Sequence, residues 1–532
     1  MSAQGRPAQP AADEVPETSA AARALITLAV ISGAFISVMD VSVVNVSLPH
    51  MRGAFGADLS SITWVATSYS IAQIIMITMS GWWSTLLGRK RFFLASYVLF
   101  TLGSILAGIS SSFTEMIVYR AIQGVGGGPL IPIAQAIMRE TYPPRYQGMA
   151  MAVFGMGVVV APAIGPVLGG WLTDTYGWPW VFYINVPFSL GGMVLVHLFV
   201  HDPPYLKRGI KRVDWGGIAF LAIGLIGLQV VLERGQEENW FESNLIVWWS
   251  AATVVAVAVL VVWELRVPEP IVDIRIMRNV PLTVGSVIIL VFGVALFGST
   301  FVLPQFLQHL LHYTAYDAGM VLLPRGIALF IILPIVGRLF NVLDLRLLLT
   351  FGTASILYAF YLISHLSLDA DFWSLVMPLI FMGLGMPCMF VTLATVTLGC
   401  VRAAEATAAS AVFNLFRRVG GNIGFALIAT LVDRRSAVHR TGLVGYLNEF
   451  NAPFLDYHEK VVNVLTSQRI DPATAQAKAY AIMDNMVNRQ AAMGAYNDAA
   501  WFMMILFTCV LPLIWLLPGR LGARPEGAGG GG

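Results

Sequence analysis

The apolar run from Leu25 to Pro49 is long enough to cross a bilayer, and Asp40 lies deep inside it. A carboxylate placed near the centre of a membrane-spanning helix costs about 2.5–3.5 kcal/mol on insertion scales. A residue kept at that cost is expected to have a function, and the chemistry open to a buried carboxylate is reversible proton binding. Asp40 is therefore the first candidate for a proton site.

Arg120, in the fourth apolar run, is the cation best placed to pair with Asp40. If the first run is directed outward and the fourth inward, both residues fall in the outer half of the membrane. A carboxylate held by an arginine stays ionised until a proton or a substrate weakens the pair, which is what a proton-coupled switch requires. The alternative is a static structural ion pair.

Other polar side chains within apolar helices are candidates for lining a substrate cavity, although each could equally join two helices by a hydrogen bond. Because several arginines accompany one carboxylate, such a cavity is expected to attract anions, and so weakly acidic lipophiles more than cationic dyes. The candidates are Asn45, Gln73, Gln123, Gln135, Gln305, Arg325, Asn414 and Arg417.

The elements that carry these residues are membrane helices. With 57% hydrophobic and 12% charged residues and a mean hydropathy of +0.73, the chain is too apolar for a soluble protein. A window of about 20 apolar residues predicts fourteen spans. They are residues 25–48, 61–83, 92–110, 115–138, 148–171, 180–200, 214–232, 245–264, 282–304, 316–339, 347–364, 372–398, 407–431 and 500–518.

The distribution of Lys and Arg predicts that both termini are cytoplasmic. With the N-terminus inside, the inner segments hold nineteen of these residues and the short outer loops only Arg52 and Arg234. A similar basic connection follows the second and the tenth span, which indicates two parallel six-helix halves. The predicted parts are a disordered tail 1–22, a half 23–200, two extra helices with basic linkers 201–281, a half 282–518 that includes a long outer loop 432–499, and a flexible tail 519–532.

Several other functions have no support in the sequence. There is no GxxxxGK[ST] loop and no large cytoplasmic domain, so neither a nucleotide cofactor nor ATP-driven transport is expected. The three cysteines and eight histidines show no spacing typical of a metal site. We therefore expect no enzyme, no catalytic residue, no cofactor, no metal and no nucleic-acid partner.

Three segments together resemble the major facilitator superfamily, in particular its fourteen-span drug:proton antiporters. They are DVSVVNVSLP from Asp40, RAIQGVGGGP from Arg120, and GVVVAPAIGPVLGG from Gly157 to Gly170. The segments GGPLIPIAQ, INVPFSLG, LERGQEENWF and VWELRVPEPIVDI are similar to those of EmrB-type multidrug efflux permeases. The resemblance covers nearly the whole chain.

The resemblance implies an all-α major facilitator fold and a proton-coupled antiporter that exports hydrophobic toxic compounds across a bacterial inner membrane by alternating access. Prolines and glycines that bend and closely pack the fifth span resemble the motif that marks antiporters. These residues are Gly157, Pro162, Gly165, Pro166, Gly169 and Gly170.

The connection after the second span resembles a superfamily loop that gates the cytoplasmic side. Its residues here are Gly81, Gly88, Arg89 and Lys90. In the superfamily an acidic residue follows the first glycine by four positions, whereas this chain has Thr85. We therefore expect the loop only to anchor the helices and to set the topology.

The resemblance further implies a periplasmic adaptor protein and an outer-membrane channel as partners, beside membrane lipid, protons and small hydrophobic substrates. Residues 432–499 are a candidate contact surface for the adaptor, and within them Asp471 followed by Pro472 predicts the start of a helix with an Asp cap. Two other functions stay open: an exporter or symporter of a metabolite or fatty acid with the same fold, and a membrane scaffold that transports nothing.

Overall fold

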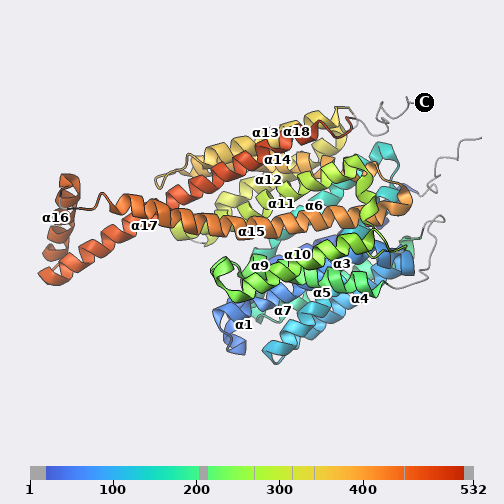
Figure 1. Ribbon diagram of the computed structural model, residues 1–532, viewed down its shortest axis with the longest axis horizontal. Coiled ribbons are helices and arrows are strands. Elements are labelled where there is room, and N and C mark those ends of the chain that lie inside the picture. Colours follow the sequence, from blue (N-terminus) through green and yellow to red (C-terminus); the bar gives the residue numbers. More distant parts are fainter. Residues whose placement is uncertain are drawn as a thin grey trace, which may run out of the picture.

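The computed structural model describes residues 19–202, 214–268, 270–313, 315–340, 342–448 and 450–519, and within them every regular element is a helix (Figure 1). Twelve of the described helices are long and apolar enough to cross a membrane. The helices α5 (Phe113–Thr141) and α11 (Val280–Gln305) match the two remaining predicted spans. Nearly all of the predicted tails and the basic residues 207–212 lie outside the described residues.

The first six spans pack mainly against one another. Helix α5 lies between α3 and α4, α1 packs along α6, and α8 packs against α1 and α4. The short helices α2 (Leu59–Ile62) and α7 (Trp180–Tyr183) precede α3 and α8. The bounds are α1 Ala20–Phe55, α3 Trp64–Leu87, α4 Arg89–Gly108, α6 Pro144–Tyr176 and α8 Asn185–Phe199.

The last six spans form a second group with matching contacts. Helix α11 packs along α15, α14 contacts both α12 and α13, and α17 contacts α13 and α15. A short π-helix, Phe306–Leu310, ends α11, and α18 (Val510–Ile514) follows α17. The bounds are α12 Ala315–Leu339, α13 Leu345–Ile363, α14 Phe372–Gly399, α15 Ala406–Val444 and α17 Pro472–Thr508.

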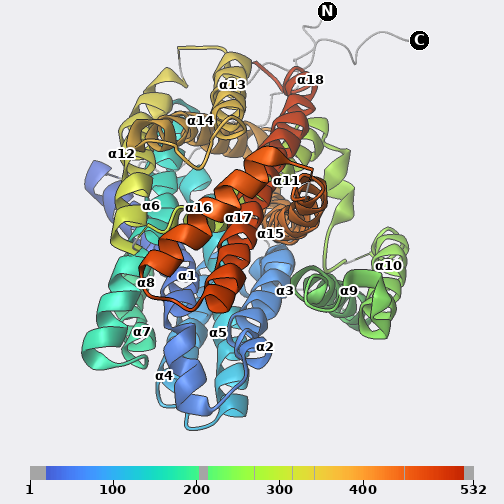
Figure 2. The ribbon, with the colours of Figure 1, turned by 90° about the vertical axis from the view of Figure 1, so that its left-hand side faces the viewer.

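The two extra helices, α9 (Trp215–Arg234) and α10 (Asn244–Glu264), pack against each other at the side of the bundle (Figure 2). Helix α9 contacts α3 of the first group and α15 of the second. The turn between them is tied to α15, because Trp240 Nε1 donates to Thr430 Oγ1 at 3.1 Å. These helices therefore touch both six-helix groups.

The two ends of the bundle differ. The basic end is the one at which α4 begins with Arg89 and α5 ends just after Arg139, and both arginines donate to carbonyls of residues 401–403 there. The hairpin end is the opposite one, where α15 and α17 continue beyond the other helices (Figure 1). The helix α16 (Ala452–Ser467) lies at the tip of this extension. As predicted, α17 begins at Pro472 with Asp471 as its N-cap, whose carboxylate accepts from Thr474 N at 3.3 Å.

The two halves meet through α3 and α5 against α15, and through α6 against α12 and α14. Several of these contacts lie toward the basic end. A Cβ on Gly81 would lie only 2.9 Å from Ala408 Cβ, and one on Gly337 would lie 3.0 Å from Ala152 Cβ. Small residues thus let the halves approach closely there.

Candidate functional site

Asp40 lies on α1 with no exposed surface, and three donors satisfy its carboxylate. Arg120 Nη1 donates to Oδ2 at 2.6 Å, Gln123 Nε2 donates to Oδ1 at 2.7 Å, and Asn185 Nδ2 donates to Oδ1 at 2.8 Å. The donors come from α5 and α8. Each oxygen of the carboxylate therefore has at least one donor, which a buried carboxyl group requires.

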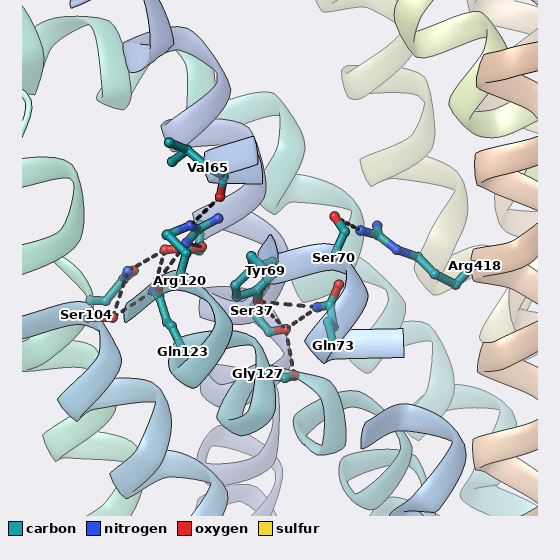
Figure 3. A network of polar contacts seen from close by, with 12 residues as sticks. Ser37, Val65, Tyr69, Ser70, Gln73, Ser104, Arg120, Gln123, Gly127 and Arg418 are labelled. Carbon is teal, nitrogen blue, oxygen red and sulfur yellow. Dashed lines mark hydrogen bonds and ion pairs between the residues drawn. The ribbon is translucent and has the colours of Figure 1, made fainter. Parts of the chain in front are cut away.

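Arg120 is itself 1% exposed, so its charge is fully withdrawn from water. Besides Asp40, it donates through Nε to Val65 O at 3.0 Å, and its Cζ lies 4.3 Å from the ring centre of Tyr69 (Figure 3). The predicted pairing of Asp40 with Arg120 is thus present in the structure. Because a buried pair is costly unless every group is satisfied, these extra contacts allow it to persist.

Glycines on α5 allow the helix to come close enough for this geometry. A Cβ on Gly124 would lie 2.4 Å from Tyr69 O of α3, and one on Gly126 would lie 2.2 Å from Phe100 N of α4. Any side chain would therefore push the helices apart. The glycine-rich sequence after Arg120 serves close packing around the Asp40 pair.

A second polar layer lies one turn before Asp40 on α1, at Ser37. Ser37 Oγ donates to Gly127 O at 2.9 Å, and Gln73 Nε2 donates to Ser37 Oγ at 3.2 Å and to Tyr69 OH at 3.3 Å (Figure 3). The Tyr69 ring also stacks on Arg120. Gln73, predicted as a cavity residue, therefore belongs to a buried layer adjacent to the Asp40 pair.

The glycine- and proline-rich segment of α6 packs directly on α1. A Cβ on Gly157 would lie 2.5 Å from Ile31 Cγ2, one on Gly165 would lie 2.5 Å from Ser42 Cβ, and one on Gly169 would lie 2.9 Å from Val43 O. By contrast, a Cβ on Gly170 would meet nothing within 4 Å.

The proline pair of α6 leaves a carbonyl for α1 to use. Pro166 has no N–H to donate to Pro162 O, four residues earlier. Ser42 Oγ donates to that carbonyl instead, at 3.2 Å. The helix that carries Asp40 is thereby fixed to α6.

The loop at the basic end is anchored by Arg89, which is 1% exposed. Its guanidinium forms an ion pair with Glu140 at the end of α5 and donates to Ala403 O of the second half at 3.0 Å. Gly88 has φ +85°, a conformation that favours glycine. Lys90 donates through Nζ to His197 O at 2.6 Å. The loop therefore joins both halves as well as anchoring helices.

Thr85 occupies the position at which the superfamily has an acid, and it is exposed and donates only to Gly81 O, at 3.0 Å, in its own helix. Two acidic residues contact the loop instead: Glu140 forms an ion pair with Arg89, and Asp202 Oδ1 accepts from Lys90 N at 2.8 Å.

Two other predicted cavity residues face each other across the halves. Asn414 Nδ2 and Ser410 Oγ of α15 both donate to Gln135 Oε1 of α5, at 2.5 and 2.6 Å. Gln135 and Asn414 are both 0% exposed. These residues join the halves by hydrogen bonds, the alternative that the sequence left open.

The remaining predicted cavity residues are dispersed. Arg325 on α12 donates to Met386 Sδ at 3.2 Å, and Arg417 on α15 is 7% exposed. Asn45 is exposed on α1, away from the Asp40 contacts. Gln305 is the last residue of α11, and its side chain is outside the described residues. The structure does not bring these four together.

Sequence reasoning missed several members of the site. Asn185 and Ser104 complete the Asp40 cluster, since Ser104 Oγ accepts from Gln123 Nε2 at 2.8 Å. A signal existed for Asn185, because it is an amide within an apolar span, as Asn45 is, although only Asn185 is buried. Glu233 was also missed, because the seventh span was predicted to end at residue 232, whereas α9 continues to Arg234.

The described residues contain no group of three His, Cys, Asp or Glu side chains that could hold a metal ion. The chemistry open to a buried carboxylate beside an arginine is the binding and release of a proton.

Comparison with known proteins agrees with this arrangement. The chain is 34% identical to the multidrug export protein EmrB of Escherichia coli K12 over 96% of this chain and 97% of that protein. It is 30% identical to the fatty acid resistance protein FarB of Neisseria gonorrhoeae over 98% and 99%.

Among solved structures, a double-Trp mutant of XylE is 12% identical with a TM-score of 0.61, covering 95% of this chain and 98% of the other. Human MFSD10 is 14% identical with a TM-score of 0.56, covering 91% and 99%. These two show the fold alone. The sequence model of the Major Facilitator Superfamily matches residues 30–425, and the chain belongs to this superfamily.

Proposed function

We propose that this multi-pass membrane protein is a proton-coupled antiporter that exports hydrophobic toxic compounds by alternating access. The observation that supports this proposal most directly is the Asp40 carboxylate, which is 0% exposed and accepts hydrogen bonds from Arg120, Gln123 and Asn185. A proton on this carboxylate removes the charge to which Arg120 is bound. The similarity to EmrB and FarB supports export as the direction of transport.

The proposed cycle begins when a proton binds Asp40 and takes the place of Arg120 as the partner of the carboxylate. Protonation of Asp40 weakens its bond to Arg120, which retains Gln123 Oε1 and Val65 O as acceptors. Because α1 is fixed to α6 through Ser42, a shift of α1 moves α6, and α6 contacts α12 and α14 of the other half. Substrate binding and proton release then restore the pair.

We propose that the basic end faces the cytoplasm, which places both termini inside and the hairpin end in the periplasm of a bacterial inner membrane. The excess of Lys and Arg supports this orientation. Residues 23–200 and 282–518 are then the two moving halves, with 201–281 as the extra helices. The tails 1–22 and 519–532 are cytoplasmic.

Weakly acidic lipophiles are the substrate class that the charges favour. Within the spanning helices, Arg325 and Arg417 accompany few carboxylates. The similarity to FarB also supports this class, because FarB is a fatty acid resistance protein and fatty acids are acidic lipophiles. Transport assays with matched acidic and cationic lipophiles test this point, and a preference for cations would contradict it.

A periplasmic adaptor protein and an outer-membrane channel are proposed partners, with the hairpin extension as the contact surface. Helix α16 and the exposed part of α17 are held beyond the bundle by Arg440, which donates to Asp484 Oδ1 at 2.7 Å. Deleting residues 460–490 is expected to abolish co-purification with the adaptor and to leave the bundle folded.

The rival functions differ in what moves across the membrane. A scaffold gives no counterflow of labelled substrate in proteoliposomes, and a symporter moves protons in the same direction as substrate. The proposal requires substrate-dependent proton flux in the opposite direction. Absence of that flux, with counterflow retained, would leave only a facilitator.

A further inference from the structure

Helix α9 brings a second carboxylate, Glu233, to the place where it contacts α3 and α15. Gln229, one turn earlier, donates to Glu233 Oε1. Asn422 of α15 in turn donates to Gln229 Oε1. An uninterrupted chain of hydrogen bonds therefore leads from the second half of the transporter to this carboxylate.

Two cations interact electrostatically with Glu233: Arg418 of α15 and its own chain neighbour Arg234. Arg418 Nη2 also donates to Ser70 Oγ of α3 at 3.0 Å, so the same arginine bridges the two halves (Figure 3). One cation is thus shared between the first half and the extra helix.

Few other ionisable groups surround Glu233. Its neighbour Arg234 lies over the Trp64 ring, with Cζ 5.2 Å from the ring centre. Helix α3 carries Tyr69 as its only ionisable side chain, and α10 carries only Glu264, at its opposite end. On α15, besides the Arg417–Arg418 pair, Asp433 accepts from Gln236 at 3.1 Å.

The second oxygen of Glu233 is arranged to receive a proton. Oε2 is buried and has no hydrogen-bond partner among the described residues. A buried carboxylate oxygen without a donor is costly while the group is charged, and a proton on Oε2 lowers that cost.

We propose that Glu233 is a second proton-binding carboxylate, which neutralises Arg418 in the empty transporter and takes up a proton when the acidic group of a substrate binds Arg418. This inference rests on the proposed export of acidic lipophiles. Glu233 and the substrate anion compete for one guanidinium. Uptake of one proton keeps the buried charge balanced when the anion replaces the carboxylate.

The test measures proton uptake on ligand binding in protein reconstituted in nanodiscs, with a pH indicator in weak buffer near neutral pH. Decanoate is the acidic probe, and decanol is the neutral probe with the same chain. The wild-type protein is expected to take up about one proton per decanoate bound and none with decanol. Glu237→Gln, an exposed position in the next turn, is expected to behave as the wild type.

Glu233→Gln is expected to bind decanoate roughly tenfold more tightly, since no carboxylate then competes for Arg418, and to take up no proton. Glu233→Asp, which keeps the carboxylate, should restore uptake and shows that any loss is not general misfolding. Unchanged uptake in Glu233→Gln, or no decanoate-linked uptake in the wild type, would overturn the inference.

Asp40→Asn separates this inference from the proposed function. That variant should lose proton-driven efflux but keep decanoate-linked proton uptake in nanodiscs. Loss of this uptake in Asp40→Asn would assign the proton to Asp40 and overturn the role of Glu233. If the wild type takes up protons with decanoate but shows no proton-driven efflux, the antiporter function is contradicted and the role of Glu233 is not.

Discussion

Ser42 on α1 donates a hydrogen bond to the carbonyl of Pro162 on α6, across 3.2 Å, and this carbonyl is the one that Pro166 cannot use. Ser42 lies two residues beyond Asp40. The break in the hydrogen bonds of α6 therefore serves as the attachment point for the helix that carries Asp40.

Gly165→Ala should disrupt this attachment, because its Cβ would lie 2.5 Å from Ser42 Cβ. We expect destabilisation of about 1–3 kcal/mol by overpacking, together with a loss of efflux. Gly170→Ala is the matched control in the same motif, since its Cβ would meet nothing within 4 Å. Thermal unfolding in detergent and efflux in vesicles measure both. Equal effects of the two substitutions would refute the packing role.

Glu140→Ala should weaken the basic end far more than Thr85→Ala. Glu140 is the ion-pair partner of Arg89, which is 1% exposed, and removing one partner of a buried pair costs roughly 3–5 kcal/mol. Thr85 bonds only within its own helix and is exposed. Protease accessibility of the basic end and efflux rate report the difference. A larger effect of Thr85→Ala would show that position 85, where the superfamily has an acidic residue, matters more to this end than Glu140.

A disulfide between positions 84 and 407 should lock the halves together at the basic end. Ser84 Oγ lies 3.5 Å from Thr407 Oγ1 in the opposite half, so two sulfur atoms placed there need only a small shift to bond. In a variant without Cys388, Cys400 and Cys509, oxidation of Ser84→Cys with Thr407→Cys is expected to stop transport, and reduction to restore it.

The single variant Ser84→Cys serves as control and should be insensitive to oxidant. Undiminished transport by the fully cross-linked double variant would show that the halves need not separate at this end.

Asn185→Ala should slow pH-driven efflux and lower the thermal stability. Asn185 Nδ2 is one of three donors to the buried Asp40 carboxylate, and its removal costs roughly 1.5–3 kcal/mol. Efflux in vesicles and thermal unfolding in detergent measure the two effects. Ser189→Ala on the same helix removes a buried hydroxyl without a hydrogen-bond partner among the described residues and should change neither. Wild-type efflux and stability in Asn185→Ala would contradict the assigned role.

The sequence was sufficient to identify the spans and the Asp40–Arg120 pair. Apolar length defines a span almost without reference to tertiary structure, and a carboxylate in an apolar run is rare enough to mark a site by itself. The cap at Asp471 and the start of α17 at Pro472 were equally local and were confirmed.

The neighbours of these residues could not be read in the same way. Whether Gln123 lines a cavity or holds Asp40, and whether Gln135 contacts Asn414, depends on how each helix is rotated about its axis. That rotation is set by close contacts such as Gly103 against Gln123, where a Cβ would lie 2.5 Å from the backbone. Polar residues alone do not encode it.

The central claim is that Asp40 carries the transported proton, and substrate-dependent proton flux in proteoliposomes tests it most directly. An imposed pH gradient, acidic on the side of the hairpin end, should drive substrate against the movement of protons in the wild type. Asp40→Asn should insert normally, keep counterflow of labelled substrate, and show neither pH-driven efflux nor proton flux opposite in direction to the substrate. Opposed proton flux at the wild-type rate in Asp40→Asn would contradict the account.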